Sequence, residues 1–440
     1  MAAELRWWAP HALPITAPPA RDVLVTMRDG RIVELAAGVS RDRAAELGAT
    51  LHDGCVIAPG FVNAHAHIEY AAYGELVDGL AFAGWIADHM QRKRRLAPEQ
   101  MRASARFGAV TALHAGITTI GDASFSGDAA HAMHELGLRG RVYLECFGGD
   151  TAAGAEATLA DTLARLEQLP SSALLHHGIS PHAPYTVGEP LYRAVAASGL
   201  PWMTHLLESQ DELDYLAGHG AMHDVTRARG FAFHDWAGRS PVQVLADVLG
   251  PDAVVVHHVH AEPADWEVLA STGAAVAHCP RSNARLGCGV MDLVAADRAG
   301  VLVALGTDSP ASAGPLDMFA ELRSAVELHR AVARDAAWPR LGRMLRAATL
   351  DAAQALGFDD LGSLDVGSHA DLVAVQVGVV DDPLVAYVLG ATPADVEAVA
   401  IAGRDMGVRA GDRAAVEAAR QQANGARTLV ALPVKQPLRR

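Results

Sequence analysis

The chain has 440 residues, 50% of them hydrophobic, so it can bury more apolar surface than one compact core usually holds. A formal charge of −15 and an aromatic content of only 5% argue against a nucleic-acid partner, because phosphates would be repelled and bases would find few stacking platforms. Four scattered cysteines without a CxxC pair argue against both a disulfide framework and a thiolate zinc site.

The N-terminal residues MAAELRWWAPHALP lack the basic, apolar and small-residue segments of a secretory signal. No uninterrupted apolar stretch is long enough to cross a bilayer. We therefore expect a cytoplasmic protein without a membrane partner.

Short β-like runs and turns occupy both ends of the chain. Near the start, Asp29-Gly30 lies between alternating apolar runs and predicts a hairpin. Similar glycine-broken runs return in residues 361–406. We expect residues 1–57 and 359–420 to pair into one small β-sandwich domain, and residues 421–440 to form a loosely packed tail.

Between these ends, residues 58–358 alternate apolar β-like runs with Ala/Leu-rich stretches of helical period. Eight such runs with interleaved helices favour a (β/α)8 TIM barrel over an open doubly wound sheet, since no phosphate-binding glycine fingerprint follows the first run. The eight runs are APGFVNAHAH, ITTIGDAS, RVYLECFG, LLHHGISPH, PWMTHLLES, AVVVHHVHA, AAVAHCPRSN and VLVALGTDS.

Polar residues stand at the C-terminal ends of these runs, where a barrel gathers its chemistry. A single histidine among 21 is usually a surface or core residue without a functional role, but polar residues at five strand ends together indicate a site. An HxH pair in an extended segment points both rings to one side, and imidazole nitrogens with a carboxylate suit Zn²⁺ or Fe²⁺. The residues concerned are His65, His67, His182, His205, Glu208, His257 and Asp308.

At these positions the sequence resembles the amidohydrolase superfamily, in its adenosine-type deaminase and triazine hydrolase branch. The matching motifs, in order, are PGFVNAHAH, SPHAPYTV, THLLES, HHVHAEP, HCPRSNARLGCG and LGTDSPAS, and the resemblance spans residues 20–410. It implies that one divalent metal is bound by His65, His67, His205 and Asp308. It also implies that Glu208 and His257, the first histidine of the HxxH, handle protons together with Asp308.

Two-metal members of the superfamily bridge their ions with a carboxylated lysine or a glutamate. Only Lys93, on an expected helix face, and Lys435, in the tail, are available, so a lysine bridge is excluded. Glu145 on the third run is the remaining candidate, and we expect one metal rather than two.

A bound divalent ion lowers the pKa of its water from about 15.7 towards about 7. We expect Asp308 and His257 to hold and deprotonate that water as it attacks the ring carbon bearing the amino group. Glu208 would protonate the neighbouring ring nitrogen and then the departing ammonia, a role that suits a carboxyl with a raised pKa.

Substrate contacts are expected from four further positions. His182 matches the residue that hydrogen-bonds the heterocycle in related deaminases, and Ser309 and Glu69 are candidates, Glu69 for ribose. Arg281 in HCPRSN has the guanidinium geometry to grip a carboxylate, although an ion pair on the barrel rim is an equal reading. The basic run Arg92 to Arg95 is either a second carboxylate partner or a solvated helix face.

The residues that follow Trp85 bear on which substrate is expected. S-adenosylhomocysteine and methylthioadenosine deaminases carry a ribose-binding glutamate shortly after this tryptophan, where this chain has Arg94. HAHIEY, the Trp85 region and HCPRSN look instead like aminodeoxyfutalosine deaminases, whose nucleoside carries a benzoate. We therefore expect an adenosine-like nucleoside, with aminodeoxyfutalosine favoured and S-adenosylhomocysteine or methylthioadenosine as the alternative.

Other readings stay open. A guanine deaminase, formiminoglutamate deiminase or triazine hydrolase would keep the metal site and change the pocket. A metal-free binding scaffold on the same barrel is an alternative from another functional class. A nucleic-acid base deaminase is discarded, because the required PCxxC is missing. By resemblance we expect a homodimer.

Overall fold

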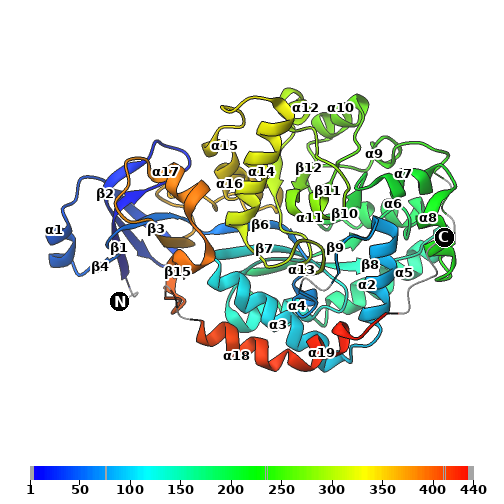
Figure 1. Cartoon of the computed structure of the whole chain (residues 1–440), viewed down its shortest axis with the longest axis horizontal. Helices are drawn as coiled ribbons and strands as arrows, with labels where there is room; N and C mark the ends of the chain where they lie inside the picture. The colour runs from blue at the N-terminus through cyan, green and yellow to red at the C-terminus, as the bar shows by residue number, and fades with distance from the viewer. Residues whose placement is uncertain are drawn as a thin grey trace.

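A barrel of alternating strands and helices and a smaller β domain make up the protein (Figure 1). The computed structural model describes residues 4–74, 77–232, 234, 236–409, 411 and 413–434. None of the helices in these ranges combines the length and apolar character that a membrane span requires.

The barrel contains eight parallel strands in the order β13-β12-β11-β10-β9-β8-β7-β6. A parallel bridge between Ala66 and Asp308 joins the two end strands. All eight predicted runs form strands, and the predicted barrel is confirmed. The strands are β6 Phe61–Ala66, β7 Ile117–Ser124, β8 Arg139–Cys146, β9 Leu175–Pro181, β10 Trp202–Leu206, β11 Ala253–His257, β12 Ala275–His278 and β13 Val303–Leu305.

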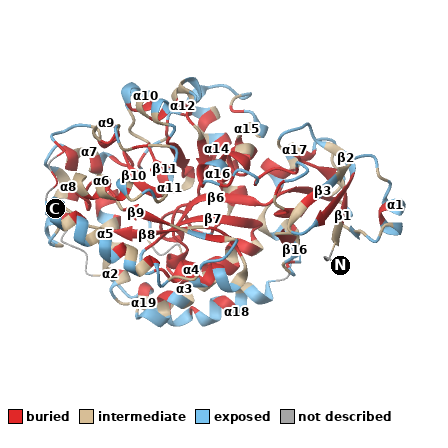
Figure 2. Ribbon diagram, turned by 180° about the vertical axis from the view of Figure 1, so that it is seen from behind, coloured by how far each residue is buried: buried red, intermediate tan, exposed pale blue. Residues whose placement is uncertain are grey.

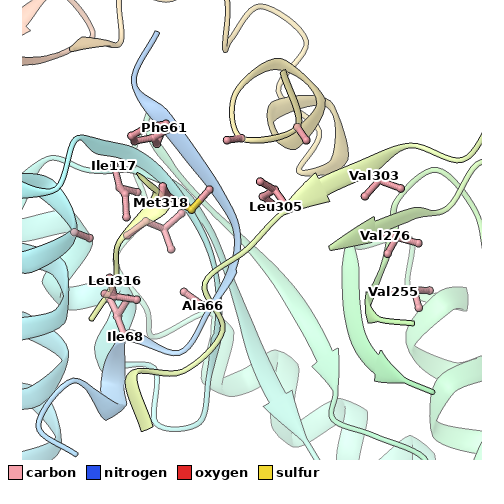
Figure 3. Close-up of a cluster of buried hydrophobic side chains, with 14 of the residues drawn as sticks. Phe61, Ala66, Ile68, Ile117, Val255, Val276, Val303, Leu305, Leu316 and Met318 are labelled. Carbon is pink, nitrogen blue, oxygen red and sulfur yellow. The ribbon is translucent and has the colours of Figure 1, made fainter. Parts of the chain in front are cut away.

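The strands separate two hydrophobic layers. Val254 and Val256 of β11 belong to the cluster inside the barrel, whereas Val255 between them packs outward against the helices. Figure 3 shows the outer layer, with Phe61 and Val276 among its labelled side chains. This alternation follows the two-residue period of a strand and leaves only the strand ends free to carry polar groups into the mouth.

Helices surround the barrel strands and expose their outer faces, while the barrel strands are mostly buried (Figure 2). In chain order they are the 3₁₀ helix η1 Ile68–Tyr70, then α2 Phe82–Lys93, α3 Pro98–His114, α4 Asp128–Leu136, α5 Ala152–Leu166, α6 Glu189–Ala197, α7 Gln210–Leu216, α8 Gly220–Arg227, α9 Pro241–Val244, α10 Pro263–Thr272, α11 Pro280–Arg285, α12 Leu293–Ala299, α13 Pro310–Ala313, α14 Met318–Ala333, α15 Leu341–Ala347 and α16 Leu350–Ala355.

Both chain ends build the smaller domain, as predicted. Its strands belong to one continuously hydrogen-bonded sheet in the order β16-β15-β14-β5-β1-β2-β3, with β4 paired to β1. The predicted hairpin joins β2 to β3, and Asp29 and Gly30 have φ values of 52° and 77°, as its tight turn requires. The elements are β1 Glu4–Ala12, β2 Ala20–Arg28, β3 Arg31–Ala36, α1 Arg41–Glu46, β4 Thr50–Leu51, β5 Cys55–Pro59, β14 Leu372–Gln376, α17 Pro383–Val385, the π-helix η2 Ala386–Gly390, the 3₁₀ helix η3 Pro393–Asp395, β15 Val396–Ile401 and β16 Arg404–Asp405.

A buried ion pair connects the two domains. Arg139, at the start of β8, donates to both carboxylate oxygens of Asp371 at 2.7 and 3.1 Å, and their side chains are 2% and 1% exposed. Asp371 also accepts the backbone N–H of Ala402 at 2.8 Å. This pair lies at the N-terminal end of the barrel strands, the end that serves stability rather than catalysis.

The end of the chain differs from the expected loose tail. Two helices, α18 Ala414–Gln422 and α19 Asn424–Ala431, lie along the barrel beside α3, and Val430 is fully buried (Figure 1). Arg92 donates to the carbonyl of Val430, and Arg95 donates to those of Leu432 and Pro433 at 2.6 and 2.8 Å. These guanidinium groups satisfy C-terminal carbonyls that a helix leaves open. The last six residues lie outside the described ranges.

Candidate active site

Three histidines and an aspartate converge at the C-terminal mouth of the barrel. His65 Nε2 lies 3.3 Å from His205 Nε2 and 3.4 Å from Asp308 Oδ1, and His67 Nε2 lies 3.6 Å from the same oxygen. Potential ligand atoms of His65, His67 and His205, and of His65, His257 and Asp308, fall within 4.8 Å of one another. The structure therefore brings together all four residues that the sequence suggested as ligands.

A register shift in β6 aims the HxH pair inward. Val62 and Ala64 belong to the interior cluster, whereas Ala66 belongs to the outer one, so the inward parity changes between them. The pairing with β7 is irregular at this point, between Asn63 and Ala66. Such a bulge re-aims side chains, and here it places both imidazoles in the mouth.

Backbone carbonyls hold two of the imidazoles in the orientation that a metal needs. His67 Nδ1 lies 2.7 Å from the carbonyl oxygen of Ala123, and His205 Nδ1 lies 2.8 Å from that of His182. An Nδ1–H that donates to a carbonyl leaves the Nε2 lone pair free to bind a cation. Burial lowers the pKa of His67 to about 4 and that of His205 below its usual value, which favours the neutral rings.

Two serines fix the carboxylate of Asp308. Ser282 and Ser312 donate to its Oδ2 at 2.5 and 2.8 Å, so that Oδ1 faces the histidines. Burial raises the pKa of Asp308, but the bond with His65 and the nearby His257 hold it well below its usual range. An ionised carboxylate among neutral imidazoles is the donor set of a Zn²⁺ or Fe²⁺ site, so these residues fit a divalent ion.

Glu208 and His257 form a second pair beside this group. His257 Nε2 lies 3.4 Å from Glu208 Oε1, and both side chains are buried. Burial raises the pKa of Glu208 well above its usual value, with Asp308 and Glu212 adding to the effect. The same burial lowers the pKa of the His257 imidazole to about 3, because its charged form is the protonated one. Such a pair can hold and pass a proton next to the ligand group.

The backbone at three strand ends is left-handed. Leu207, His257 and Asp308 have φ values of 57°, 72° and 55°. In regular strand alternation His257 would point outward with Val255, and the left-handed turn brings its ring back into the mouth. Non-glycine residues in this region cost about 1–3 kcal/mol each and gather at functional sites.

His67, His205, Glu208, His257 and Asp308 line a cavity of about 820 Å³, a volume that includes space open to solvent. Aromatic side chains supply much of its wall, namely Tyr70, Phe82, Trp85, Phe147, Tyr185 and Phe231. His182 and Ser309, the two other expected substrate contacts at this mouth, also line the cavity, and His182 Nδ1 lies 2.8 Å from Thr186 Oγ1, which leaves Nε2 for a ligand. Its size and apolar walls suit a small aromatic molecule.

Residues 56–406 match the amidohydrolase family. The chain belongs to this family. As an amidohydrolase it is a hydrolase that acts on carbon–nitrogen bonds, and the predicted resemblance is confirmed.

Within the family, the chain is similar to several deaminases. The 5-methylthioadenosine/S-adenosylhomocysteine deaminase of Halobacterium salinarum is 33% identical over 368 residues, which cover 81% of this chain and 80% of that protein. A zinc-bound adenosine deaminase of Xanthomonas campestris superposes with a TM-score of 0.80 at 27% identity, covering 96% of this chain and 98% of its own. Aminofutalosine deaminase of Helicobacter pylori, solved with methylthio-coformycin, shares the fold, with a TM-score of 0.78 at 22% identity over 91% of this chain and 99% of its own.

Two expected substrate contacts of this amidohydrolase do not reach the cavity. Arg281 donates to the carbonyls of Ala313 and Pro315 and pairs with the buried Glu321 at 3.3 Å, which is the ion-pair reading of this residue. Glu69 instead caps α4, where it accepts the backbone N–H of Ser126 at 3.1 Å and that of Gly127 at 3.1 Å. A carboxylate at a helix N-terminus is stabilised by the open N–H groups there and is not free for ribose.

The basic run has divided roles. Arg94 is exposed, and Arg92 and Arg95 hold α19, so only Arg94 fits a solvated face. Lys93, expected on an outer helix face, instead lines the cavity. It follows Trp85 and His89 at four-residue steps on α2, and all three side chains face the cavity. That spacing was the available signal, because residues four apart share one helix face.

Sequence reasoning missed Arg229, which also lines the cavity. This residue follows α8, and no pattern around it distinguishes it from the neighbouring arginine at 227. Glu145, considered only as a metal bridge, lines the cavity too but belongs to neither group of potential ligands.

Proposed function

We propose that this amidohydrolase is a hydrolytic deaminase of an adenosine-like nucleoside, which converts a 6-amino group to a 6-oxo group and releases ammonia. The observation that carries the proposal is the Glu208–His257 pair, held 3.4 Å apart beside the ligand group in the lining of an aromatic cavity. The deaminase names of the relatives support it.

His65, His67, His205 and Asp308 would hold one divalent ion, zinc or iron. When bound, such an ion lowers the pKa of water from about 15.7 towards about 7. Zinc is bound in the adenosine deaminase structure to which this chain is similar. Glu145 stands apart from both ligand groups among the described residues, which supports a single ion.

The chain's own residues move the protons. Because its pKa is raised well above the usual value, Glu208 can hold a proton and give it to the ring nitrogen beside the reacting carbon. His257, uncharged at neutral pH, accepts a proton from the attacking water together with Asp308, whose carboxylate the two serines orient. His182 Nε2 donates to or accepts from the heterocycle and so fixes its plane. Glu208, now ionised, takes the proton of the newly added hydroxyl group and passes it to the departing ammonia. His257 then returns the first water proton to Glu208 across the 3.4 Å between them.

Arg229 supports a substrate that carries a negative charge on the group attached to its ribose. Its Nη2 donates to the carbonyl of Ala87 at 2.9 Å, while its Nη1 is buried without a partner among the described residues. Burial, and then the charge of Arg94, lower the pKa of Arg229. A half-buried guanidinium whose buried Nη1 lacks a partner is costly, and a ligand carboxylate would relieve that cost.

Aminodeoxyfutalosine remains the favoured substrate, because its benzoate supplies this carboxylate and the ribose-binding acid expected after Trp85 is replaced by Arg94. The names of the relatives favour the second candidate, S-adenosylhomocysteine or methylthioadenosine. Of these two, only S-adenosylhomocysteine carries a carboxylate for Arg229. The homodimer and the cytoplasmic location stay predictions.

The test is ammonia release from a panel comprising aminodeoxyfutalosine, adenosine, methylthioadenosine, S-adenosylhomocysteine, guanine and a triazine, with metal content measured on the same sample. Turnover of guanine or the triazine but of no nucleoside would overturn the substrate class. A chain that binds no metal and releases no ammonia would favour the binding scaffold instead.

Glu208→Gln tests the proton-handling role. Its metal content should equal that of the wild type, and its kcat should fall by about 10²–10⁴-fold, the usual contribution of general acid–base catalysis. Glu156→Gln, on the exposed face of α5, is the matched control and should keep full activity. Retained activity in Glu208→Gln would refute the assignment.

A further inference from the structure

One part of the cavity wall carries a carboxylate and an ammonium that the reaction above does not use. Glu145 stands one residue before the end of β8, and Lys93 is the last residue of α2. Both line the cavity, on elements that are far apart in the chain. Their chemistry therefore faces the same ligand as the catalytic residues do.

The carboxylate of Glu145 lacks a protein partner. The side chain is 3% exposed, yet within the described ranges no residue donates a hydrogen bond to it or forms an ion pair with it. Burial raises its pKa to about 7, which Lys93 lowers and Glu69 raises. Buried polar groups in native proteins are almost always hydrogen-bonded, so this acid points to a ligand that donates.

Lys93 is fixed in place but keeps hydrogens to spare. Its Nζ lies 3.3 Å from the hydroxyl of Tyr70 and 3.4 Å from the centroid of the Phe125 ring. An ammonium has three N–H donors, and these contacts use one hydrogen bond and one aromatic face. The remaining donors are available to an acceptor in the cavity.

A second metal ion does not explain this pair. Glu145 belongs to neither cluster of potential ligands, and the positive charge of Lys93 in the same wall opposes a cation. A second general acid is not needed, since Glu208 is already paired with His257. A ligand group that both donates to a carboxylate and accepts from an ammonium fits best, and a hydroxyl does both.

We propose that Glu145 and Lys93 bind the ribose hydroxyls of the substrate. Glu145 accepts hydrogen bonds from the 2′- and 3′-hydroxyl groups, and Lys93 donates to a hydroxyl oxygen. The pair takes the role for which Glu69 was the candidate and for which the chain has Arg94 after Trp85. The inference rests on the proposed nucleoside deaminase function and adds to it the residues that recognise the sugar.

The test compares adenosine with 2′-deoxyadenosine, 3′-deoxyadenosine and 2′,3′-dideoxyadenosine in the wild type, Glu145→Gln and Lys93→Met, all metal-loaded. Each nucleoside is also measured as a competitive inhibitor of the fastest substrate in the panel, so that binding without turnover still gives an affinity. Glu156→Gln again serves as the matched control.

In the wild type, kcat/KM or affinity should be about 10–100-fold higher for adenosine than for the dideoxy analogue, as expected for bonds to a charged acceptor. Glu145→Gln should lose this preference by weakening adenosine alone, and Lys93→Met should reduce it in the same direction. If Glu145 had a merely structural role, Glu145→Gln would lower kcat/KM or affinity equally for adenosine and for the dideoxy analogue.

Equal handling of adenosine and its dideoxy analogue by the wild type would overturn the inference and leave the deaminase function standing. An equal loss on both nucleosides in Glu145→Gln would also overturn it. If the metal-loaded wild type neither turns over nor binds any nucleoside, the proposed function fails and the inference fails with it.

Discussion

The two serines that hold Asp308 offer a direct test of the proposed metal site. Ser282 and Ser312 each donate to Oδ2 of this carboxylate, at 2.5 and 2.8 Å, and both hydroxyls are buried. A hydrogen bond to a charged group contributes about 1.5–3 kcal/mol, and loss of such a supporting contact usually weakens metal binding about 10–100-fold. Ser282→Ala or Ser312→Ala should therefore weaken metal binding by this factor.

The two effects should not add. The serine hydroxyls also contact each other at 2.9 Å, so removing one disturbs the other, and the double variant should lose less than the product of the two factors. Competition with a chromogenic chelator measures the affinity, and elemental analysis gives the stoichiometry.

The matched control is Ser363→Ala. Ser363 is a buried serine that donates to a carboxylate, that of Asp365, at 2.9 Å, but it lies in the segment leading to the smaller domain. The Ser363→Ala variant should be less stable than the wild type but should bind the metal with the same affinity. Full metal affinity in Ser282→Ala and Ser312→Ala together would refute the view that Asp308 is a ligand positioned by these serines.

Two further changes test the framework around the site. Gly306→Ala should abolish tight metal binding, because a Cβ there would lie 2.8 Å from the backbone nitrogen of His65, while Gly342→Ala, with no atom within 4 Å, should not; equal metal content in both would contradict this. Arg139→Met should lower the free energy of unfolding by about 3–5 kcal/mol, because it leaves the buried Asp371 carboxylate unpaired, and urea denaturation would count against the reasoning if the loss were under about 1 kcal/mol.

Sequence alone was sufficient to predict the barrel and the polar residues that meet at its mouth. The strand ends are legible because a parallel barrel forces apolar strands, and polar residues that interrupt those strands at their ends have only the mouth to face. His65, His205 and Asp308 are such residues, and the structure places His65 Nε2 3.3 Å from His205 Nε2 and 3.4 Å from Asp308 Oδ1.

Helix-borne contacts were less predictable. The direction of a side chain on a helix depends on how the helix is rotated against the barrel, which no local pattern states. Arg281 follows β12 directly, yet Pro280 starts α11 and turns the guanidinium away, to Glu321 of α14. Lys93 turns the other way, into the cavity, although it stands in the same kind of charged run that usually faces solvent.

The overall charge gives these inward-facing cations their significance. A chain with a formal charge of −15 repels an anionic nucleoside at long range, but at physiological salt this field is screened beyond about 8 Å. Within the cavity, the local sign is set by Lys93, Arg229 and whatever ion the ligand group holds, against the buried carboxylates. Selection of an anionic substrate therefore depends on the few charges that line the cavity and not on the net charge of the protein, so the acidic composition does not argue against a carboxylated nucleoside.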